Sequence, residues 1–214
     1  QSAAILNHPP SDIDLDYDAI VIGAGISGLY QLYKLREIGM KVCVFEMGTG
    51  VGGTWYWNRY PGARFDSESY SYAYSFSQEL LDEWDWSEHF ASQPEILRYL
   101  QHVADKFDLV KDIQFSSEVQ SAIYSDDTRS WEIRLQDGSR FRSRFLITGI
   151  GLLSQPTLPR IPGIDSFKGQ SFHTSRWPQP GMSRHAVWHG KRGVYPGAPI
   201  RSRGPVRSAA SAIC

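Results

Sequence analysis

The sequence predicts an α/β fold in which a parallel sheet is joined to a small antiparallel β-meander. Residues 19–22 form a short apolar run of the kind found in buried parallel strands, and residues 42–45 form a second one. Between these runs, apolar residues over 26–33 recur at helical spacing, so the three segments read as a strand, a helix and a strand. Short alternating runs of apolar and polar residues between 113 and 145 indicate the antiparallel strands.

Local signals mark the ends of these elements. Gly39 predicts the C-terminal end of the first helix, and the pairs Asp126-Asp127 and Asp137-Gly138 predict hairpin turns. Residues 92–95, Ser-Gln-Pro-Glu, have the pattern of a capping box at the start of a core-facing helix. The last strand is expected over 145–148, as a buried strand.

Composition limits the kind of protein this can be. The 214 residues, 41% of them hydrophobic, suffice for one substantial core or two small domains. A net charge of -1 argues against a nucleic acid or a membrane surface as the main partner. Cys43 and Cys214 offer no disulfide framework, which favours a reducing cytoplasm, and no apolar run approaches the roughly 20 residues of a spanning helix. The histidines lack metal-ligand spacing, so no metal site is expected.

A glycine-rich turn stands between the first strand and the helix. It has the pattern G-x-G-x-x-G and consists of Gly23, Ala24, Gly25, Ile26, Ser27 and Gly28. In such a unit the first glycine permits a tight turn, the second admits a pyrophosphate, and the third lets the helix approach the sheet. Glu46 follows the second strand, where an acid accepts hydrogen bonds from ribose hydroxyls of either NAD or FAD. The pattern indicates dinucleotide binding, and an ordinary strand–turn–helix unit is the alternative.

An aromatic segment follows the second strand closely. Gly50, Gly52 and Gly53 precede a dense series of aromatic residues that includes Trp55 and Tyr60. The glycines would let backbone amides approach a second group of a cofactor, and the aromatic faces would flank a planar ring. The alternative is that these aromatic residues fill the core.

Two long motifs resemble the fingerprints of flavin-dependent Baeyer–Villiger monooxygenases. The first matches G-G-x-W-x4-[FY]-P-G-x3-D and comprises Gly52, Gly53, Trp55, Tyr60, Pro61, Gly62 and Asp66. The second matches F-x-G-x3-H-x3-W-P and comprises Phe167, Gly169, His173, Trp177 and Pro178. Two such motifs in the right order are far more specific than either one, and the resemblance covers residues 16–178.

The resemblance implies a domain organisation. Residues 16–178 are expected to form a Rossmann-like FAD-binding domain after an N-terminal extension of residues 1–15. In this family the second motif lies at the junction with an NADPH-binding domain, but no strand, glycine-rich turn and helix follow it here. Residues 179–214 form an irregular tail with only basic charges. We therefore expect that the NADPH-binding domain is missing through truncation or a frameshift; a natural basic tail is the alternative.

The resemblance also implies which residues form the site. The expected FAD-binding residues are Gly23, Gly25, Ile26, Ser27, Gly28, Glu46, Gly53, Thr54, Trp55, Tyr60 and Asp66. Asp66 is the expected catalytic residue, because the corresponding aspartate of the family pairs with an arginine that holds negative charge. That arginine comes from a region that this chain lacks. Residues 148–151 occupy the place of a further turn against the cofactor, without the usual alanine.

The resemblance implies a reaction with two cofactors, FAD and NADPH. The family inserts one oxygen atom of O2 next to the carbonyl of a small-molecule ketone, which gives an ester or a lactone. We expect this chain to be inactive alone. One alternative is an amine- or sulfide-oxidising flavin monooxygenase, which Asp66 and the Trp177-Pro178 pair disfavour. A non-catalytic FAD-binding fragment is the other.

Overall fold

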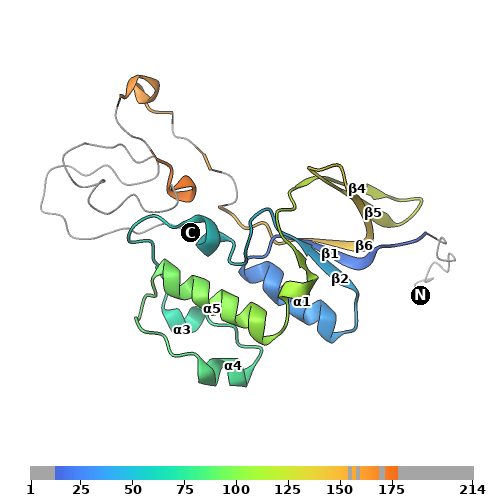
Figure 1. Cartoon of the computed structure of the whole chain (residues 1–214), viewed down its shortest axis with the longest axis horizontal. Coiled ribbons are helices and arrows are strands. Elements are labelled where there is room, and N and C mark those ends of the chain that lie inside the picture. Colours follow the sequence, from blue (N-terminus) through green and yellow to red (C-terminus); the bar gives the residue numbers. More distant parts are fainter. Residues whose placement is uncertain (1–12, 154–155, 158–159, 169–171, 178–214) are drawn as a thin grey trace, which may run out of the picture. The chain divides into compact units, whose positions relative to one another are not determined.

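The chain folds into two compact units, which we describe separately. The computed structural model describes residues 13–153, 156–157, 160–168 and 172–177 (Figure 1). The first unit combines the chain up to Thr49 with Leu109–Gly149, and the second combines Gly50–Asp108 with the chain from Ile150 onward. Most of the predicted N-terminal extension and all of the predicted tail lie outside the described residues, so the domain boundaries stay predictions.

The first unit is a six-stranded mixed sheet with the strand order β3-β2-β1-β6-β5-β4. Its strands are β1 (Tyr17–Ile22), β2 (Val42–Phe45), β3 (Ile113–Gln114), β4 (Val119–Ser125), β5 (Ser130–Leu135) and β6 (Arg140–Thr148). β1 pairs in parallel with β2 and β6, and β2 pairs in parallel with β3. β4, β5 and the first half of β6 form an antiparallel meander. The predicted α/β class, with its parallel sheet and small meander, is confirmed.

Helix α1 (Ile26–Glu37) connects β1 with β2, as the helical spacing predicts. Leu29 and Leu32 are fully buried, and Figure 1 shows the helix beside the parallel strands. The helix ends where Gly39 donates its N–H to the carbonyl of Arg36 at 2.9 Å. The connection is therefore the strand–helix–strand unit that brings the ends of two parallel strands together.

The meander has tight turns at both predicted places. Asp137 accepts a hydrogen bond from the N–H of Ser139 at 2.8 Å, so its side chain stabilises the turn between β5 and β6. The turn between β4 and β5 includes Arg129, a non-glycine residue with a φ of 46°. The Arg144 side chain donates to the carbonyl of Arg129 at 2.6 Å and so holds this left-handed residue in place.

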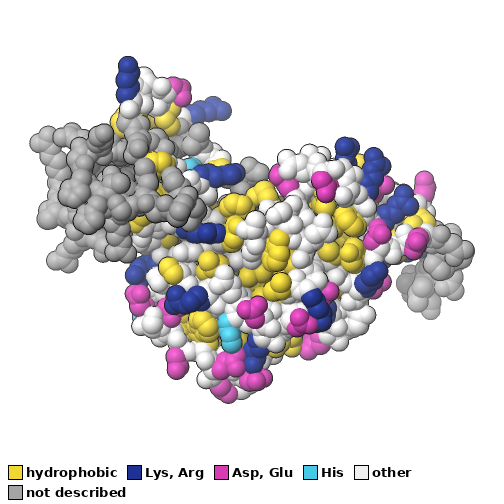
Figure 2. Space-filling model, in the orientation of Figure 1, with side chains coloured by type: hydrophobic (Ala, Val, Ile, Leu, Met, Phe, Trp, Pro, Cys, Tyr) yellow, Lys and Arg dark blue, Asp and Glu magenta, His cyan; other side chains and the backbone are white. Residues whose placement is uncertain are grey.

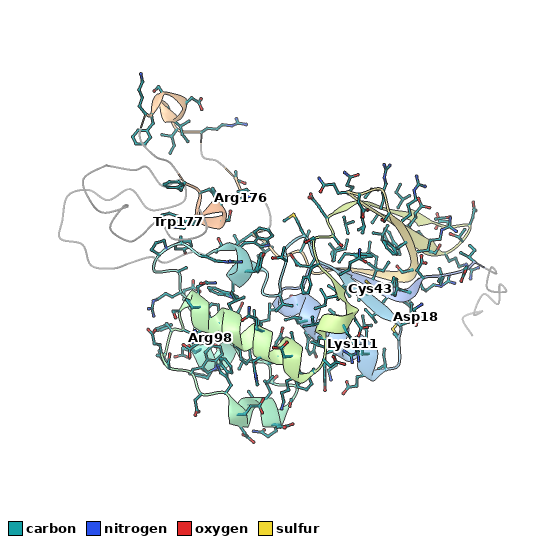
Figure 3. All side chains as sticks on the ribbon, in the orientation of Figure 1. Asp18, Cys43, Arg98, Lys111, Arg176 and Trp177 are labelled. Atoms are coloured by element: carbon teal, nitrogen blue, oxygen red, sulfur yellow. The ribbon has the colours of Figure 1, made fainter. Side chains whose placement is uncertain are left out.

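The core of the first unit lies between the parallel strands and the meander. One cluster of this core consists of five buried residues: Ile20, Cys43, Phe45, Ile133 and Leu135. The rings of Phe45 and Phe141 are 4.9 Å apart, which joins β2 to β6 across this cluster. Cys43 lies on β2 (Figure 3), and burial raises the pKa of its thiol, so the thiol stays protonated and packs as a small apolar side chain.

One expectation about β6 is wrong in part. The strand forms over residues 145–148 as predicted, but Phe145 is 55% exposed rather than buried. The antiparallel pairing with β5 ends at Ser143, whereas the pairing with β1 continues to Thr148. The second half of β6 therefore has a neighbouring strand on one side only. An apolar run in the sequence does not predict how many neighbouring strands a strand will have.

The second unit is helical in the part of the chain that the structure describes. Its helices are α2 (Thr54–Trp57), α3 (Ser69–Tyr72), α4 (Gln78–Glu83) and α5 (Gln93–Lys106), with short 3-10 turns η2 (Ile164–Ser166) and η3 (Thr174–Arg176). Helix α5 buries Ile96, Tyr99, Leu100 and Val103 on one face, as its apolar spacing predicts. The opposite face carries Arg98 (Figure 3). Among the described helices, none is long and apolar enough to cross a membrane.

The start of α5 differs from the predicted capping box. Ser92 is the N-cap residue, but its side chain caps no backbone N–H of the helix. Glu95 does not reach back to Ser92; its carboxylate accepts hydrogen bonds from the N–H and the hydroxyl of Ser87 at 2.8 and 2.7 Å. A preceding loop supplies better donors for this buried carboxylate than the first turn does, so a tertiary contact replaces the local cap.

Charged residues join α4 to α5 at the surface. Glu83 contacts Nε2 of His102 at 2.6 Å and Nζ of Lys106 at 3.0 Å. Lys106 also contacts Glu79 at 2.9 Å. On the face drawn in Figure 2, acidic side chains gather at the lower edge, where Figure 1 places α4. Lys106 of α5 therefore offsets part of the negative charge of α4.

This cluster predicts a pH dependence of stability. Hydrogen bonds from His102, and then from Lys106, lower the pKa of Glu83 below its ordinary value of 4.5. A carboxyl group with a lowered pKa stabilises the fold above that ordinary value, and the stabilisation is lost as the pH falls through the pKa of the folded state. Wild type should therefore melt at a higher temperature than Glu83→Gln above pH 4.5, and the gap should close at lower pH.

Thermal melting of both proteins at a series of pH values tests this prediction. Glu79→Gln is the control, because Glu79 contacts the same lysine but is 77% exposed, and ion pairs at exposed sites contribute little. A gap between wild type and Glu83→Gln that stays constant through the acid range would contradict the prediction.

Candidate functional site

The glycine-rich turn lies at the carboxyl ends of two parallel strands. Gly23 follows β1 with a φ of 99°, which side chains rarely tolerate, and its N–H donates to the carbonyl of Phe45 on β2 at 2.8 Å. Gly25 is the N-cap residue of α1 and has an extended backbone, with a φ of -79°. The chain therefore reverses within three residues, from the end of β1 into the first turn of the helix.

Close backbone packing explains the third glycine of the turn. A Cβ atom added to Gly28 would lie 1.8 Å from the carbonyl oxygen of Gly23. A Cβ atom on Gly149, just after β6, would lie 3.2 Å from the carbonyl oxygen of Ile22 and 3.3 Å from the nitrogen of Gly28. Gly149 also donates its N–H to Ile22 at 2.8 Å. Three backbone segments meet here, and only glycine lets α1 begin so close to the sheet.

Glu46 holds the turn from the end of β2. The side chain is 5% exposed. One carboxylate oxygen accepts the N–H of Ala24, inside the glycine turn, and the other accepts the N–H of Gly48, each at 2.7 Å. A carboxylate has about four acceptor sites, so these two bonds leave acceptor capacity on both oxygens.

The first turn of α1 suits an anion. No side chain caps the helix at Gly25, and no acidic residue lies in its first turn. A helix N-terminus carries a partial positive charge and backbone N–H groups that point along the axis. Ser27 lies in this turn and is exposed. The structure thus brings the predicted residues of the glycine turn and Glu46 together around one helix N-terminus.

The second unit contains the first long motif. Gly52 and Gly53 have positive φ values of 128° and 51°, and a Cβ atom on Gly52 would lie 2.5 Å from the Leu97 side chain on α5. The carbonyl of Gly52 accepts the N–H of Trp55 at 3.0 Å, which starts α2. The glycine pair is therefore needed for the turn into α2 and for its packing on α5.

Trp55 is a core residue of its own unit. It is 4% exposed, and its indole N–H donates to the hydroxyl of Tyr72 at 2.8 Å. Its ring makes edge contacts with Phe65 and Tyr72, with centroids 5.7 and 6.1 Å away. The Gln93 side chain, which sequence reasoning missed, donates to the Trp55 carbonyl. This is the core packing that the sequence left open as an alternative, and a contact of Trp55 with a cofactor stays a prediction.

Thr54 is the first residue of α2, and Tyr60 lies three residues after the end of this helix. The carbonyl of Thr54 accepts the N–H of Asn58 at 2.9 Å, and the carbonyl of Tyr60 accepts the N–H of Ala63 at 3.1 Å. Both residues are half-buried. Asp66 follows in an exposed bend between two residues that are tied to the loop before α5, Phe65 and Ser69. Cofactor contacts of these residues stay predictions.

Part of the second long motif lies within the described residues. His173 is the N-cap of η3, where its Nδ1 accepts the N–H of Ser175 at 3.2 Å. The rings of Phe172 and Trp177 are 5.5 Å apart, and Trp177 follows Arg176 at the end of this turn (Figure 3). His173 thus orders a local turn. Gly169 and Pro178 lie outside the described residues.

No metal centre accompanies these features within the described ranges, where no three His, Cys, Asp or Glu residues form a group that could hold an ion. The first unit offers an uncapped helix N-terminus with the buried carboxylate of Glu46 beside it. A parallel strand pair, a three-glycine turn and an acid at the second strand define a dinucleotide-binding unit of the Rossmann type.

Comparison with known proteins gives the family. The family model for flavin-binding monooxygenase-like proteins matches residues 18–195. The chain therefore belongs to this family. Its similarity to Baeyer–Villiger monooxygenases, predicted from the two motifs, is confirmed. The chain is 46% identical over 168 residues to a Baeyer–Villiger monooxygenase of Pseudooceanicola batsensis, and the match covers 78% of this chain and 31% of that relative.

Three curated relatives illustrate the similarity. The chain is 52% identical over 161 residues to 2-oxo-Δ3-4,5,5-trimethylcyclopentenylacetyl-CoA monooxygenase of Pseudomonas putida. This match covers 75% of this chain and 30% of the relative. It is 50% identical over 165 residues to cyclohexanone 1,2-monooxygenase of Acinetobacter, with 77% and 30% covered. It is 49% identical over 165 residues to acetone monooxygenase of Gordonia, with 77% and 31% covered.

Solved structures agree with this assignment. A steroid monooxygenase bound to NADP superposes with a TM-score of 0.71 at 52% identity, covering 76% of this chain and 31% of that one. A complex of OTEMO with FAD and NADP superposes with a TM-score of 0.73 at 51% identity, covering 78% and 31%. The chain thus spans about 30% of the length of the curated relatives that it matches.

The close packing at Gly28 predicts that Gly28→Ala lowers stability. Alanine is the better helix former, so any loss must come from the contact of the new methyl group with the Gly23 carbonyl. We expect the free energy of unfolding to fall by about 1–3 kcal/mol, the usual range for overpacking. Urea denaturation followed by circular dichroism measures this change.

Gly50→Ala is the matched control for Gly28→Ala. Its new Cβ atom would lie 3.3 Å from the ring of Tyr56, a side chain that can move, and the expected change is within about 0.5 kcal/mol. If both variants lost the same stability, the close approach at Gly28 would not be the constraint that the geometry indicates.

Proposed function

We propose that this chain is the FAD-binding part of an NADPH-dependent flavin monooxygenase that inserts oxygen next to the carbonyl of a small-molecule ketone. The observation that carries the proposal is the glycine turn with Glu46 beneath it. The relatives named for acetone, cyclohexanone and cyclopentanone support the substrate class. Bound flavin would supply the reaction with O2, and the residues of this chain hold and orient it.

The geometry of the first unit fits the ADP half of FAD. The N–H groups at the start of α1 and the positive end of the helix suit the pyrophosphate. The backbone at Gly25 leaves no side chain between the turn and a phosphate. The remaining acceptor capacity of Glu46 suits ribose hydroxyls, since its two oxygens each accept one backbone N–H.

Glu46 also gives this site a preference between the two cofactors. NADPH carries an additional phosphate on its adenosine ribose, and a carboxylate at that place repels the phosphate and offers it no donor. FAD has a free hydroxyl there, which donates to the carboxylate. We therefore assign FAD, and not NADPH, to the glycine turn; NADPH would be the cosubstrate of the whole protein.

The proposed role of Asp66 is to orient a cation. A carboxylate beside an arginine fixes the direction of the guanidinium and compensates its charge in a site without water. The resemblance assigns this pairing to Asp66, with an arginine from outside this chain. The other proposed FAD contacts, Gly53, Thr54, Trp55 and Tyr60, rest on the same resemblance.

Oxidation of nitrogen is a second candidate. The chain is 48% identical over 163 residues to phenazine N-monooxygenase PhzNO1 of Lysobacter antibioticus, with 76% of this chain and 30% of the relative covered. This identity is close to that of the ketone-oxidising relatives. The substrate class would then depend on residues outside this stretch. Assays of the whole protein with cyclic ketones and with phenazines distinguish the two candidates.

A cytoplasmic location belongs to the same proposal. Cys43 is a free, buried thiol, which suits a reducing compartment, and the reaction needs a supply of NADPH.

The proposed cofactor site predicts that Gly25→Val abolishes FAD binding and leaves the fold intact. The φ of -79° at Gly25 is open to any residue, so the turn should form. The valine side chain would occupy the space where the backbone must approach the pyrophosphate. The purified wild-type chain should carry flavin absorbance that the variant lacks, while their circular dichroism spectra agree. Equal flavin retention in both proteins would refute the assignment.

The proposal also predicts that the 214-residue chain alone forms no ester or lactone. The pattern G-x-G-x-x-G occurs at residues 23–28 and again at 48–53, but only the first lies in a strand–helix–strand unit. The resemblance places the arginine that would pair with Asp66 outside this stretch. NADPH consumption and product formation with linear and cyclic ketones are measured on the FAD-loaded chain. Product formed in step with NADPH consumption would show that this stretch completes the site.

A further inference from the structure

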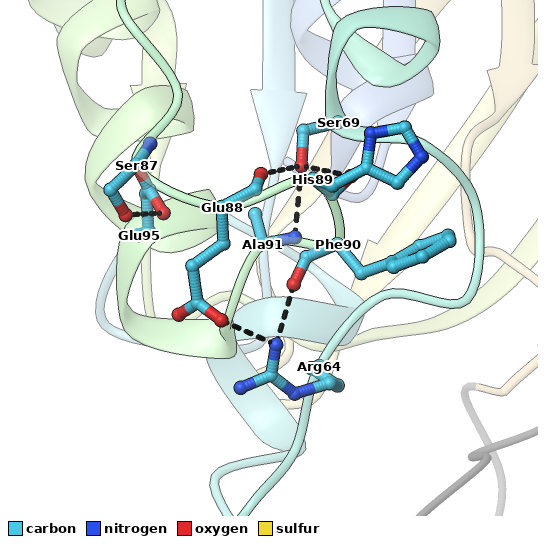
Figure 4. A network of polar contacts seen from close by, with 8 residues as sticks. All are labelled: Arg64, Ser69, Ser87, Glu88, His89, Phe90, Ala91 and Glu95. Carbon is cyan, nitrogen blue, oxygen red and sulfur yellow. Dashed lines mark hydrogen bonds and ion pairs between the residues drawn. The ribbon is translucent and has the colours of Figure 1, made fainter.

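Buried Ser69 ties the segment that carries Asp66 to the loop before α5 (Figure 4). We propose that Ser69 is a positioning residue for Asp66. The proposal rests on the role of Asp66 proposed above, and it adds a residue that neither of the two long motifs includes.

Ser69 is placed to do this by four hydrogen bonds. It is 2% exposed, and its N–H donates to the carbonyl of His89 at 2.8 Å. Its hydroxyl hydrogen is shared between two acceptors, the carbonyl of Glu88 at 2.8 Å and the carbonyl of His89 at 3.0 Å. The hydroxyl oxygen accepts the N–H of Ala91 at 2.9 Å. The Ser69 hydroxyl thus bonds both a backbone donor and backbone acceptors of the facing loop. Because the hydroxyl is buried, water cannot take its place if it is removed.

A second set of contacts holds the chain on the other side of Asp66. Phe65 donates its N–H to the carbonyl of Ala91 at 3.0 Å. The Arg64 side chain contacts the carboxylate of Glu88 and the carbonyl of Phe90, both at 2.7 Å (Figure 4). Asp66 therefore lies in a short bend that is attached to the same loop immediately before it and three residues after it.

The loop that receives these bonds is itself anchored at both ends. The carboxylate of Glu95, which is 4% exposed, accepts two hydrogen bonds from Ser87. At the other end, Gln93 donates its N–H to the carbonyl of Ala63 at 2.9 Å. A buried carboxylate that lost its donors would be costly, so the loop is a stable base for the bend.

The bend sets the position of Asp66 and the direction of its Cα–Cβ bond. Asp66 is exposed, and among the described residues no hydrogen bond to its side chain is present. Its position therefore depends on the backbone, and the backbone depends on Ser69 and Phe65. Orientation of a cation loses its effect when the carboxylate is displaced by about an ångström, which is why the anchor matters for function.

The first experiment measures amide hydrogen exchange by mass spectrometry on the full chain. Ser69→Ala should accelerate exchange about tenfold in the segments 64–69 and 88–91, as expected for the loss of about one hydrogen bond. Ser71→Ala is the matched control, because its hydroxyl is exposed and donates within the same turn, to the carbonyl of Glu68 at 2.7 Å. Unchanged exchange in Ser69→Ala, or equal acceleration in both variants, would overturn the proposal.

If Ser69→Ala does not fold, Ser69→Cys takes its place. The thiol has nearly the same shape and is a weak hydrogen-bond partner, so the same segments should still exchange faster than in Ser71→Ala. Absence of that difference in a folded Ser69→Cys protein overturns the proposal equally.

The second experiment separates positioning from a merely structural role. It is made on the whole protein, in which the proposal pairs Asp66 with its arginine, and measures the midpoint potential of bound FAD in wild type, Ser69→Ala, Asp66→Asn and the double variant. If Asp66 acts on the flavin chemistry as proposed, Asp66→Asn changes the potential. Ser69→Ala should then shift it when Asp66 is present and leave it unchanged in the Asp66→Asn background, because Ser69 acts through Asp66.

Each outcome of the potential measurement has one meaning. A shift in Asp66→Asn without one in Ser69→Ala overturns the positioning role and leaves the proposed function standing. Equal shifts by Ser69→Ala in both backgrounds show that Ser69 acts independently of Asp66 and overturn it too. No change in Asp66→Asn removes Asp66 from the proposed function, and the inference falls with it.

Discussion

The first unit depends on a backbone contact that side chains would prevent. The start of α1 lies so close to the end of β1 that a methyl group on Gly28 would lie 1.8 Å from the Gly23 carbonyl oxygen. Gly149 brings the end of β6 into the same contact. The packing of α1 on the ends of β1 and β6 depends on this close approach, and the proposed phosphate site lies at the same helix N-terminus.

Glu46 links that constraint to chemistry. Its carboxylate binds the N–H of Ala24 within the turn, so the acid that we propose to recognise a ribose also stabilises the turn that we propose to bind the pyrophosphate. In the second unit the same principle recurs with different residues. Ser69 and Glu95 are buried polar side chains, and both bind the backbone of the loop at 87–91. In both units, buried polar groups with satisfied hydrogen bonds hold irregular segments in place.

The differences between prediction and structure have a common origin. The pattern at Ser92 and Glu95 is that of a capping box, but Glu95 bonds to Ser87 because the loop that precedes the helix offers two donors. For Trp55 the sequence left core packing open as an alternative, and its ring packs on Phe65 and Tyr72, while its cofactor contact stays a prediction. In both cases the residues occupy the motif positions that the sequence indicates, but residues outside the motif pattern determine which contacts their side chains make.

The sequence by itself determined the α/β class, the order of strand, glycine turn and helix, the hairpin turns of the meander and the family. These features depend on periodicity and on residue types that have one conformational use, such as glycine where the backbone approaches closely. Only the tertiary structure decided that Glu46 binds Ala24, that Phe145 is exposed and that Ser69 holds the bend of Asp66. The Glu46–Ala24 and Ser69–His89 hydrogen bonds join residues 22 and 20 positions apart, and no local sequence pattern specifies which distant segment packs there.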